Sequence, residues 1–438
     1  MNIANAMVAD YQEAPSVSRT YAWVVFALTF GLLLSDYMSR QVLNAVFPLL
    51  KAAWGLSDTQ LGSLSGVVAL MVGLLTFPLS LLADRWGRVK SITVMAAVWG
   101  LATLGCALAN NYGEMLVARF FVGLGEAAYG SVGIALILSI FPANMRSTLT
   151  GAFMAGGAFG SVLGMGIGGV IAVHMGWRWS FGIMALFGLV LVSIYRLVVT
   201  EQRLAQQKSE VTTEAKEAAA ARISWRAMLP SLFSTRTVKC VYVGSGLQFF
   251  LMGAILAWMP SYLNRYYAMP TDKAGVTAAM FLLIAGVGMV FCGGITDRFS
   301  RNNPSRKLTF AIAFCLVSFT FLSLALQIPA GPLQLVLLGL GIFLVAGTSG
   351  PAGAMVAGLT PTSIHATAFA TLTLANNLLG LAPGPFVTGL IADKVGLLVA
   401  LRVILFIGLL ATAVFVIAKR KYSHDLAYLD AMRAKARI

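Results

Sequence analysis

The second long apolar segment of the chain ends in Leu82-Ala-Asp-Arg-Trp-Gly-Arg88, and the eighth ends in Ile295-Thr-Asp-Arg-Phe-Ser-Arg301. Both stretches share the pattern Asp-Arg-x-Gly/Ser-Arg, and each follows the second apolar segment in a set of six. A pattern that recurs at the same place in two sets indicates a duplicated unit. The simplest account of the chain is therefore two copies of a six-helix unit.

The composition places these segments in a membrane. The chain of 438 residues is 58% hydrophobic and 11% charged, whereas a soluble protein carries roughly 25% charged residues. About 20 helical residues cross a hydrocarbon core of ~30 Å. Segments of that kind lie near residues 21–50, 58–83, 90–109, 114–141, 147–173, 177–199, 237–264, 273–296, 307–328, 332–359, 364–391 and 396–418. We predict an all-α integral membrane protein with twelve transmembrane helices in two pseudo-symmetric six-helix bundles, and not a soluble enzyme.

Basic residues are distributed unevenly along the chain, whose formal net charge is +15. Of the 31 Lys and Arg, 23 lie on the two termini and on one set of loops. The positive-inside rule makes these loops and both termini cytoplasmic. Because the loops are short, we expect a multi-pass protein of a bacterial inner membrane. The basic excess reports topology and attraction to membrane lipid, so nucleic acid is not an expected partner.

The two bundles divide the chain into parts with different environments. The central linker, residues 202–222, is rich in Ala, Glu, Lys and Gln, and it is either an amphipathic surface helix or a flexible connection. The tail begins Lys-Arg-Lys and is expected to form a short helix near anionic lipid. The expected parts are a cytoplasmic N-terminal segment (1–20), the first bundle (21–199), a cytoplasmic linker (200–236), the second bundle (237–418) and a cytoplasmic tail (419–438).

Four ionisable residues lie inside apolar segments of the first half: Asp36, Arg40, Arg119 and Glu126. An unpaired charge at the bilayer centre costs about 2.5–3.5 kcal/mol, so these side chains must face a cavity or each other. Asp36 and Arg40 lie four residues apart on one helical face. Arg119 and Glu126 share another face, about 10 Å apart along the axis. Either Asp36 pairs with Arg40, or one of the carboxylates pairs across helices.

Two interpretations of this cluster remain open. In the first, the ion pairs only pin the first and fourth helices together. In the second, a proton site lies beside an anion site, because burial disfavours an ionised carboxylate and a neighbouring arginine favours it. A substrate anion that takes Arg40 or Arg119 then leaves the carboxylate easier to protonate, which couples protons to the substrate.

The repeated turn and the fourth and fifth segments resemble the major facilitator superfamily. Ala83–Arg88 is similar to its cytoplasmic signature, Arg119–Ala127 to its intramembrane arginine motif, and the glycines of Gly156–Gly169 to its helix-packing motif, without the usual proline. In that superfamily the signature latches the halves in the outward-facing state. Ser300 replaces a glycine in the second copy. The resemblance implies gating roles for Asp84, Arg85, Arg88, Arg146, Asp297 and Arg301.

Within the superfamily the chain most resembles the spinster transporters. The similar stretches are Tyr37–Leu43, Gly123–Tyr129, Gly160–Gly164 and Ala366–Pro385. Organic anion symporters share the first of these patterns. In both families an aspartate usually precedes the first-helix arginine directly, but Ser39 stands there in this chain.

The carboxylate of the first helix stands instead at Asp36, three residues before Ser39. In spinster-like proteins the residues that match Arg40 and Glu126 are implicated in proton coupling. The resemblance therefore favours Glu126 over Asp36 as the titrating group, within a coupling set of Glu126, Asp36, Arg40 and Arg119.

Polar side chains in otherwise apolar segments are the candidates for substrate binding. The second half offers Gln248, Asn376 and Asn377, whose amides either bind substrate or hold helices together. A charged first half that faces an apolar second half suits an amphipathic anion, such as a lysophospholipid, a sphingoid phosphate or a hydrophobic carboxylate. The expected substrate-binding set is Arg40, Glu126, Tyr129, Gln248, Asn376 and Asn377.

These observations predict a monomeric, proton-coupled secondary active transporter that moves a lysophospholipid-like, sphingolipid-like or other organic anion by alternating access. An organic carboxylate/proton symporter and an uncoupled facilitator are the alternatives. The expected partners are a small-molecule or lipid substrate, protons and membrane lipid. The sequence holds no catalytic constellation, and its four cysteines have no metal-type spacing, so no enzyme activity, metal or cofactor is expected.

Overall fold

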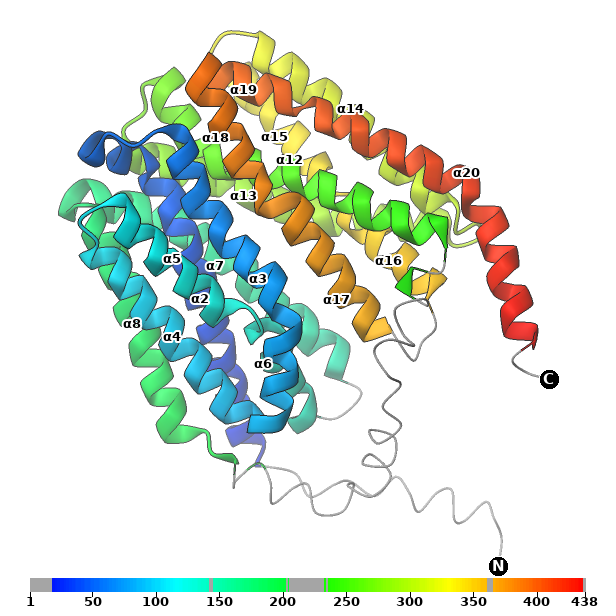
Figure 1. The fold of residues 1–438 in the computed structure, drawn as a ribbon, viewed down its shortest axis with the longest axis horizontal. Helices are drawn as coiled ribbons and strands as arrows, with labels where there is room; N and C mark the ends of the chain where they lie inside the picture. Colours follow the sequence, from blue (N-terminus) through cyan, green and yellow to red (C-terminus); the bar gives the residue numbers. More distant parts are fainter. Residues whose placement is uncertain are drawn as a thin grey trace, which may run out of the picture.

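The structure, a computed structural model, describes residues 18–141, 145–201, 204, 232–233, 235–360 and 365–435. Within these residues the regular elements are helices, and no strand occurs. Twelve helical stretches are long and apolar enough to cross a membrane. The predicted all-α membrane fold is therefore confirmed (Figure 1).

Polar caps set the ends of the helices in the first half. Ser18 caps the first helix by accepting from the backbone N–H of Tyr21, and Gly55 ends it in the left-handed conformation, with φ 63°. The next helix begins almost at once, because Ser57 and Gln60 form a capping box. The helices are α2 (Arg19–Trp54), α3 (Asp58–Trp86), α4 (Arg88–Leu108), α5 (Tyr112–Glu126), α6 (Tyr129–Ile140), α7 (Arg146–Met175) and α8 (Trp177–Val198).

The second half repeats this order after the linker, whose central residues lie outside the described part. Its last helix runs unbroken to Lys435, so the expected tail helix is a continuation of the last membrane-spanning helix. The elements are α12 (Arg236–Tyr267), α13 (Thr271–Ser300), α14 (Arg306–Gln327), α15 (Pro332–Ala346), α16 (Ser349–Leu359), α17 (His365–Asn376), the π-helix η4 (Asn377–Leu381), α18 (Pro383–Val395), α19 (Leu397–Ile404) and α20 (Phe406–Lys435).

Four segments expected as single helices are interrupted. The fourth breaks at Ala127, whose carbonyl accepts from the Thr76 hydroxyl of α3 at 2.6 Å. The tenth breaks at the equivalent place, between α15 and α16, and the twelfth between α19 and α20. The eleventh contains η4, where the Ala382 N–H bonds to the Asn377 carbonyl at 2.9 Å. Pro383 follows and has no N–H to continue the regular ladder.

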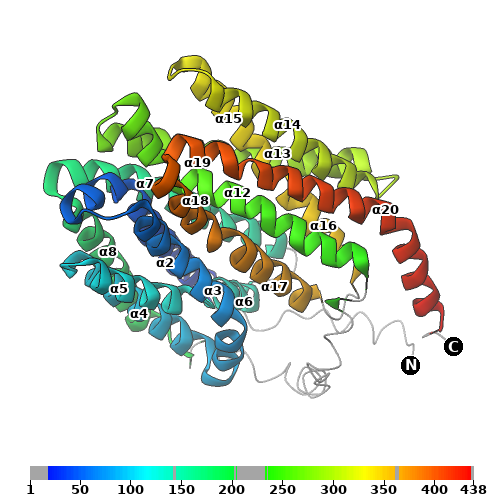
Figure 2. The same ribbon diagram turned by 45° about the horizontal axis from the view of Figure 1, so that its top comes forward.

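The two halves meet at one end of the bundle, which we call the closed side. It lies opposite the terminal side, where α2 begins and α20 ends. A Cβ on Gly62 would overlap the carbonyl of Pro385, and one on Gly66 would overlap that of Ala382, so α3 lies directly on the segment that contains α18. Figure 2 shows α3 along this contact, beside α17 and α18. The closest approaches therefore fall in the half of α3 nearest the closed side.

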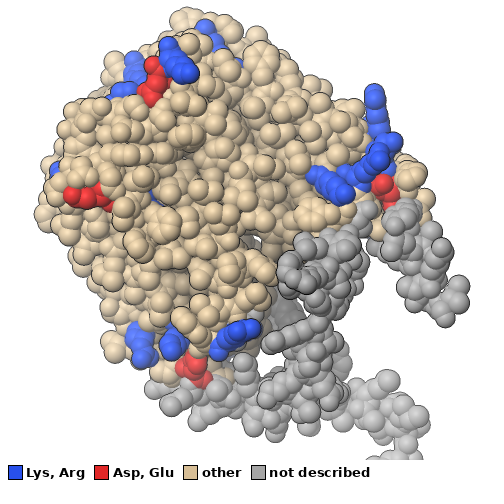
Figure 3. Space-filling model, in the orientation of Figure 1, with Lys and Arg blue, Asp and Glu red and all other residues tan. Residues whose placement is uncertain are grey.

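Charged side chains gather at the two ends of the helices and leave a broad uncharged belt between them (Figure 3). Many large apolar side chains of the helices are exposed, including Leu197 at 81% and Val290 at 77%. Exposed apolar surface on this scale is stable only in contact with lipid. The belt is therefore the membrane-facing surface.

Candidate functional site

The glycine-rich helix α7 holds α2 in position. A Cβ on Gly160 would overlap the carbonyl oxygen of Leu34, and one on Gly164 would lie 2.5 Å from that of Met38. The two backbones are in contact, which only glycine permits at these places. The predicted helix-packing role of these glycines is confirmed. Their packing sets the face of α2 that carries Arg40.

An ion pair joins α2 to α5 inside the first half. Nε of Arg40 lies 3.3 Å from Oε2 of Glu126, and the two side chains are 21% and 3% exposed. Asp36, one turn before Arg40, is buried and interacts electrostatically with both of these residues. The structure thus brings three of the four predicted charges together, with two carboxyl groups beside one guanidinium.

When both carboxyl groups are ionised, each of these three side chains keeps one polar atom without a hydrogen-bond partner among the described protein atoms, whereas a proton on one carboxyl group allows Asp36 and Glu126 to bond to each other. The three atoms are Oδ1 of Asp36, Nη2 of Arg40 and Oε1 of Glu126. A buried polar atom left in this state costs about 1–3 kcal/mol. One open donor suits an anionic ligand, and an open carboxyl oxygen suits a proton. The arrangement can therefore hold both an anion and a proton.

Arg119 is fully buried and makes different contacts. Its Nε, Nη1 and Nη2 donate to the carbonyl oxygens of Leu64, Ser39 and Arg40 at 3.3, 3.1 and 3.3 Å. Among the described residues, no carboxylate lies within ion-pair distance of its guanidinium. Arg119 thus ties α5 to α2 and α3 and holds the backbone that carries Arg40.

The break after α5 places Glu126 at a helix end. Tyr129, a predicted substrate-binding residue, begins the next helix on the far side of this break. Its hydroxyl donates to the Thr29 carbonyl at 2.6 Å, and its ring packs edge-on against Trp99 with centroids 4.9 Å apart. Tyr129 is fully buried, and its side chain packs from α6 against α2 and α4.

The three predicted amides of the second half point to different neighbours. Nε2 of Gln248 donates to Sγ of Cys315 at 2.7 Å, which turns this side chain toward α14. Asn376 accepts from the Ser245 hydroxyl at 2.7 Å, and Asn377 lies against Gly73 of α3. Only Asn377, at the start of the π-helix, lies against the first half among these contacts. Its Oδ1 has no partner among the described protein atoms.

The predicted gating residues lie on the terminal side, and Arg88 and Asp297 contact their own half. Nη1 of Arg88 donates to the Ala135 carbonyl of α6 at 2.9 Å. Asp297 pairs with Lys307 at 3.2 Å. Arg85 and Arg301 are exposed. The side chains of two further candidates, Asp84 and Arg146, lie outside the described part.

A set of polar contacts on the closed side joins the halves, and sequence reasoning missed it. Arg265, in the last turn of α12, makes a two-pronged ion pair with Asp58 of α3, with N···O distances of 2.7 and 2.6 Å. Lys51 of the first half also pairs with Asp58, at 2.5 Å. Asp393 of α18 accepts from the backbone N–H groups of Asp58 and Thr59 at 2.7 and 2.8 Å. We call these five residues the closed-side network.

The signal for this network in the sequence is faint. An acidic residue in the first turn of a helix, such as Asp58, is typical of any helix N-terminus. Arg265 and Asp393 resemble ordinary charges at helix ends. Their pairing requires contact between the two halves, and local pattern carries no information about that contact.

A family comparison identifies the fold. The family model of the Major Facilitator Superfamily matches residues 28–385. The chain belongs to this superfamily. It is therefore a multi-pass membrane transporter and not an enzyme, and the predicted superfamily membership is confirmed.

The relatives of this superfamily member fall into more than one group. It is 26% identical over 356 residues to the probable L-galactonate transporter of Escherichia coli (strain K12), and this alignment covers 77% of this chain and 76% of that protein. It is 24% identical over 401 residues to protein spinster homolog 1 of Xenopus laevis, and this alignment covers 86% of this chain and 74% of that protein. A solved bacterial homologue of the human lysosomal transporter spinster, inward-facing and occupied, matches with a TM-score of 0.78 at 18% identity, over 93% of this chain and 99% of that one.

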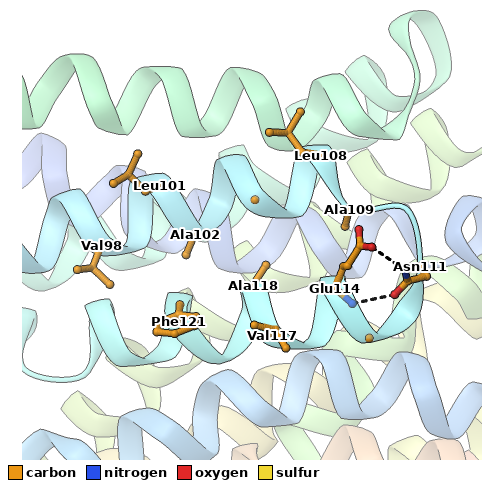
Figure 4. A pocket seen from close by; sticks show the side chains of 12 residues that line it. Val98, Leu101, Ala102, Leu108, Ala109, Asn111, Glu114, Val117, Ala118 and Phe121 are labelled. Carbon is orange, nitrogen blue, oxygen red and sulfur yellow. Dashed lines mark hydrogen bonds between the residues drawn. The ribbon is translucent and has the colours of Figure 1, made fainter.

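The superfamily member also carries a cavity of about 770 Å³ between α4 and α5 (Figure 4). Apolar side chains line most of it, including Leu101, Leu108 and Phe121, which are exposed on the membrane-facing surface. Asn111 and Glu114 form its polar end and are hydrogen-bonded to each other. Its lining includes none of the predicted site residues, so it is separate from the charged site.

Proposed function

We propose that this chain is a proton-coupled secondary active transporter of an organic anion, and that binding of substrate to Arg40 is coupled to protonation of Glu126 through the Arg40–Glu126 pair. The observation that carries the proposal is this pair, with an N···O distance of 3.3 Å, in which the side chain of Glu126 is 3% exposed and that of Arg40 is 21% exposed. The pair lies beside a break in a membrane helix, and interrupted helices are a recurrent feature of transporter binding sites.

Coupling follows from the exchange of partners at Arg40. A carboxylate or phosphate of the substrate binds the open Nη2 of Arg40. Arg40 then neutralises the substrate in place of Glu126. Glu126 is left as a buried charge beside Asp36, and a proton neutralises it. Anion and proton load together, which makes the cycle a symport, and departure of the anion restores the ion pair and expels the proton.

The two sides of the molecule take alternate roles in this proposal. The terminal side is cytoplasmic, because the basic loops and both termini belong to it. The closed-side network joins the halves at the opposite face, so in the proposed cycle this state admits substrate to Arg40 from the cytoplasmic side. Transport then requires the network to break while the terminal side closes, which is alternating access between two rocking halves of an inner-membrane protein.

The substrate class follows from the two walls of the site. The spinster resemblance, together with a charged first half and an apolar second half, favours an amphipathic anion of lysophospholipid or sphingolipid type. The relative named as an L-galactonate transporter favours a small organic carboxylate carried with a proton, which is the alternative. Both substrates offer Arg40 the same anionic group.

A transport experiment tests the proposal. A thermal-shift screen of lysolipids and organic acids on the purified protein supplies the substrate, and the hit is then followed in proteoliposomes under a pH gradient. We expect Glu126→Gln to abolish gradient-driven accumulation and to retain substrate exchange, because a neutral side chain cannot carry the proton. Glu114→Gln, on an exposed carboxylate of the same helix, is the matched control. Undiminished gradient-driven uptake by Glu126→Gln would refute proton coupling at this residue.

Counterflow separates a transporter from an uncoupled facilitator of channel type. Substrate preloaded inside the vesicles accelerates entry through a transporter, because the loaded site returns faster than an empty one. A channel shows no such stimulation. Absence of counterflow in the unmodified protein would favour the facilitator.

A further inference from the structure

A second cavity, of about 260 Å³ and with polar side chains in its lining, lies on the terminal side at the second copy of the repeated turn. The end of α13 lines it through Asp297, Ser300 and Arg301, and α14 contributes Lys307. Met355 of α16 stands among the apolar residues of the lining. The cavity is separate from the Arg40–Glu126 site and is not used in the transport cycle proposed above.

The serine that departs from the repeated pattern has a conformation of its own. In the first copy, α3 stops at Trp86 and Gly87 adopts φ 95°, where a Cβ would overlap the carboxylate of Glu201. In the second copy, α13 continues through Ser300, and the following Arg301 keeps a helical φ of −54°. Position 300 therefore does not need glycine, and a side chain can be carried there without strain.

Ser300 stands in the wall of the cavity, and its hydroxyl has no partner among the described protein atoms. Ser300 is 2% exposed and lines the cavity. Its Oγ makes no hydrogen bond to any described protein atom. A buried hydroxyl in this position costs about 1–3 kcal/mol unless a ligand or water completes it. It is thus an unsatisfied buried donor in the wall of the cavity.

The charges around Ser300 define the ligand. Nζ of Lys307 lies 3.2 Å from Oδ1 of Asp297, which leaves further ammonium donors free, because an ammonium group has three. Arg301 adds a second cation, so the cavity carries two positive charges and one negative. Fork-shaped guanidinium donors combined with an ammonium and a hydroxyl match the oxygens of a phosphate group.

We propose that this cavity binds a phosphate group, with Arg301, Lys307 and Ser300 as donors. A phosphate at this place comes from the headgroup of an anionic phospholipid or from inorganic phosphate. The apolar part of the lining, which includes Met355, and the position at the ends of membrane-spanning helices favour the phospholipid. Basic pockets between helices on the cytoplasmic side are the usual places for such headgroups.

Binding to the intact purified protein tests the site without reference to transport. Thermal shift is measured against concentration for dioctanoyl phosphatidylglycerol, for phosphatidylcholine of the same chain length, and for inorganic phosphate. We expect phosphatidylglycerol to stabilise the protein and Arg301→Gln to raise its half-saturating concentration about tenfold, because a charge-assisted hydrogen bond is lost. Ser300→Ala should raise it about threefold. Arg298→Gln, on the same turn but not in the lining, should leave it unchanged.

The control lipid and the variants keep the outcome decisive. Stabilisation by phosphatidylglycerol alone assigns the lipid as the source, and stabilisation by inorganic phosphate that Arg301→Gln weakens assigns the free ion. Either result supports a phosphate site. Equal curves for the unmodified protein, Arg301→Gln and Ser300→Ala overturn the proposal, as does equal stabilisation by phosphatidylcholine. Ser300→Ala removes one hydroxyl only, so the test does not depend on the folding of Arg301→Gln.

Discussion

Arg265→Gln should open the closed side of this transporter. Within the closed-side network, Arg265 of the second half forms an ion pair with Asp58, a buried carboxylate of the first half. Its two nitrogens lie 2.7 and 2.6 Å from the oxygens of Asp58, whose side chain is 4% exposed. Glutamine keeps most of the length of the side chain but loses the charge and the fork of donors.

The size of the effect follows from the burial of the pair. Removing one partner of a fully buried pair costs about 3–5 kcal/mol, whereas exposed pairs contribute about 0–1 kcal/mol. Arg265 is 26% exposed, and Lys51 still pairs with Asp58 when Arg265 is changed. We therefore expect a loss of about 2 kcal/mol between the halves, which changes the ratio of closed to open molecules about thirtyfold.

The distance between the halves can be measured directly. Asn110 and Lys394 are exposed, and each lies at the closed-side end of a different half. Spin labels at these positions, after replacement of the native free cysteines, report the separation by pulsed electron resonance. Arg265→Gln should shift population from the short to the long distance.

Lys51→Gln is the matched control for this measurement. Lys51 pairs with the same carboxylate but belongs to the same half as Asp58, so its loss should leave the distance distribution nearly unchanged. Equal shifts in both variants would show that Asp58 acts only through local stability. An unchanged distribution in Arg265→Gln would refute the gating role of the pair.

Three further predictions concern backbone contacts of the helices. Asp393→Asn weakens the cap that α18 provides to α3, by about 1 kcal/mol, and should shift the same distance distribution less than Arg265→Gln does. Gly66→Ala places a Cβ against the carbonyl of Ala382 and should also separate the closed side, whereas Gly130→Ala meets open space and should be silent in the same measurement. Arg119→Leu removes three hydrogen bonds to backbone carbonyls and should lower stability by about 3 kcal/mol, seen as a lower melting temperature; an unchanged melting temperature would contradict its structural role.

Hydropathy and repetition were sufficient to predict the architecture of the chain. Twelve apolar segments appear as twelve membrane-spanning stretches because lipid leaves a helix as the only way to satisfy their backbone groups. The breaks within these stretches were not predictable. No proline marks the interruption at Ala127, which accompanies a hydrogen bond from Thr76, 51 residues earlier in the chain.

The charged site shows the same limit. The cost of a charge in hydrocarbon selected Asp36, Arg40, Arg119 and Glu126 from the sequence, but several pairings satisfied that requirement. The structure pairs Arg40 with Glu126 and directs Arg119 to backbone carbonyls. That choice depends on how closely α2, α3 and α5 approach. The glycines that set the approach were visible in the sequence, whereas the resulting distances were not.

The duplicated architecture and the single charged site together constrain how this transporter works. The fourth and tenth membrane helices break at equivalent places, but α5 ends in Glu126 whereas α15 ends in Ala346. In the second half, α12 carries no charged residue between Cys240 and Asn264, so this part of the helix offers no ionic partner to a buried carboxylate. The proposed proton site therefore lies wholly within one half. The ion pair that joins the two halves, Arg265 with Asp58, belongs instead to the closed-side network. Coupling then requires that loading of Arg40 changes how the two halves pack at the centre, where Asn377 lies against Gly73 of α3.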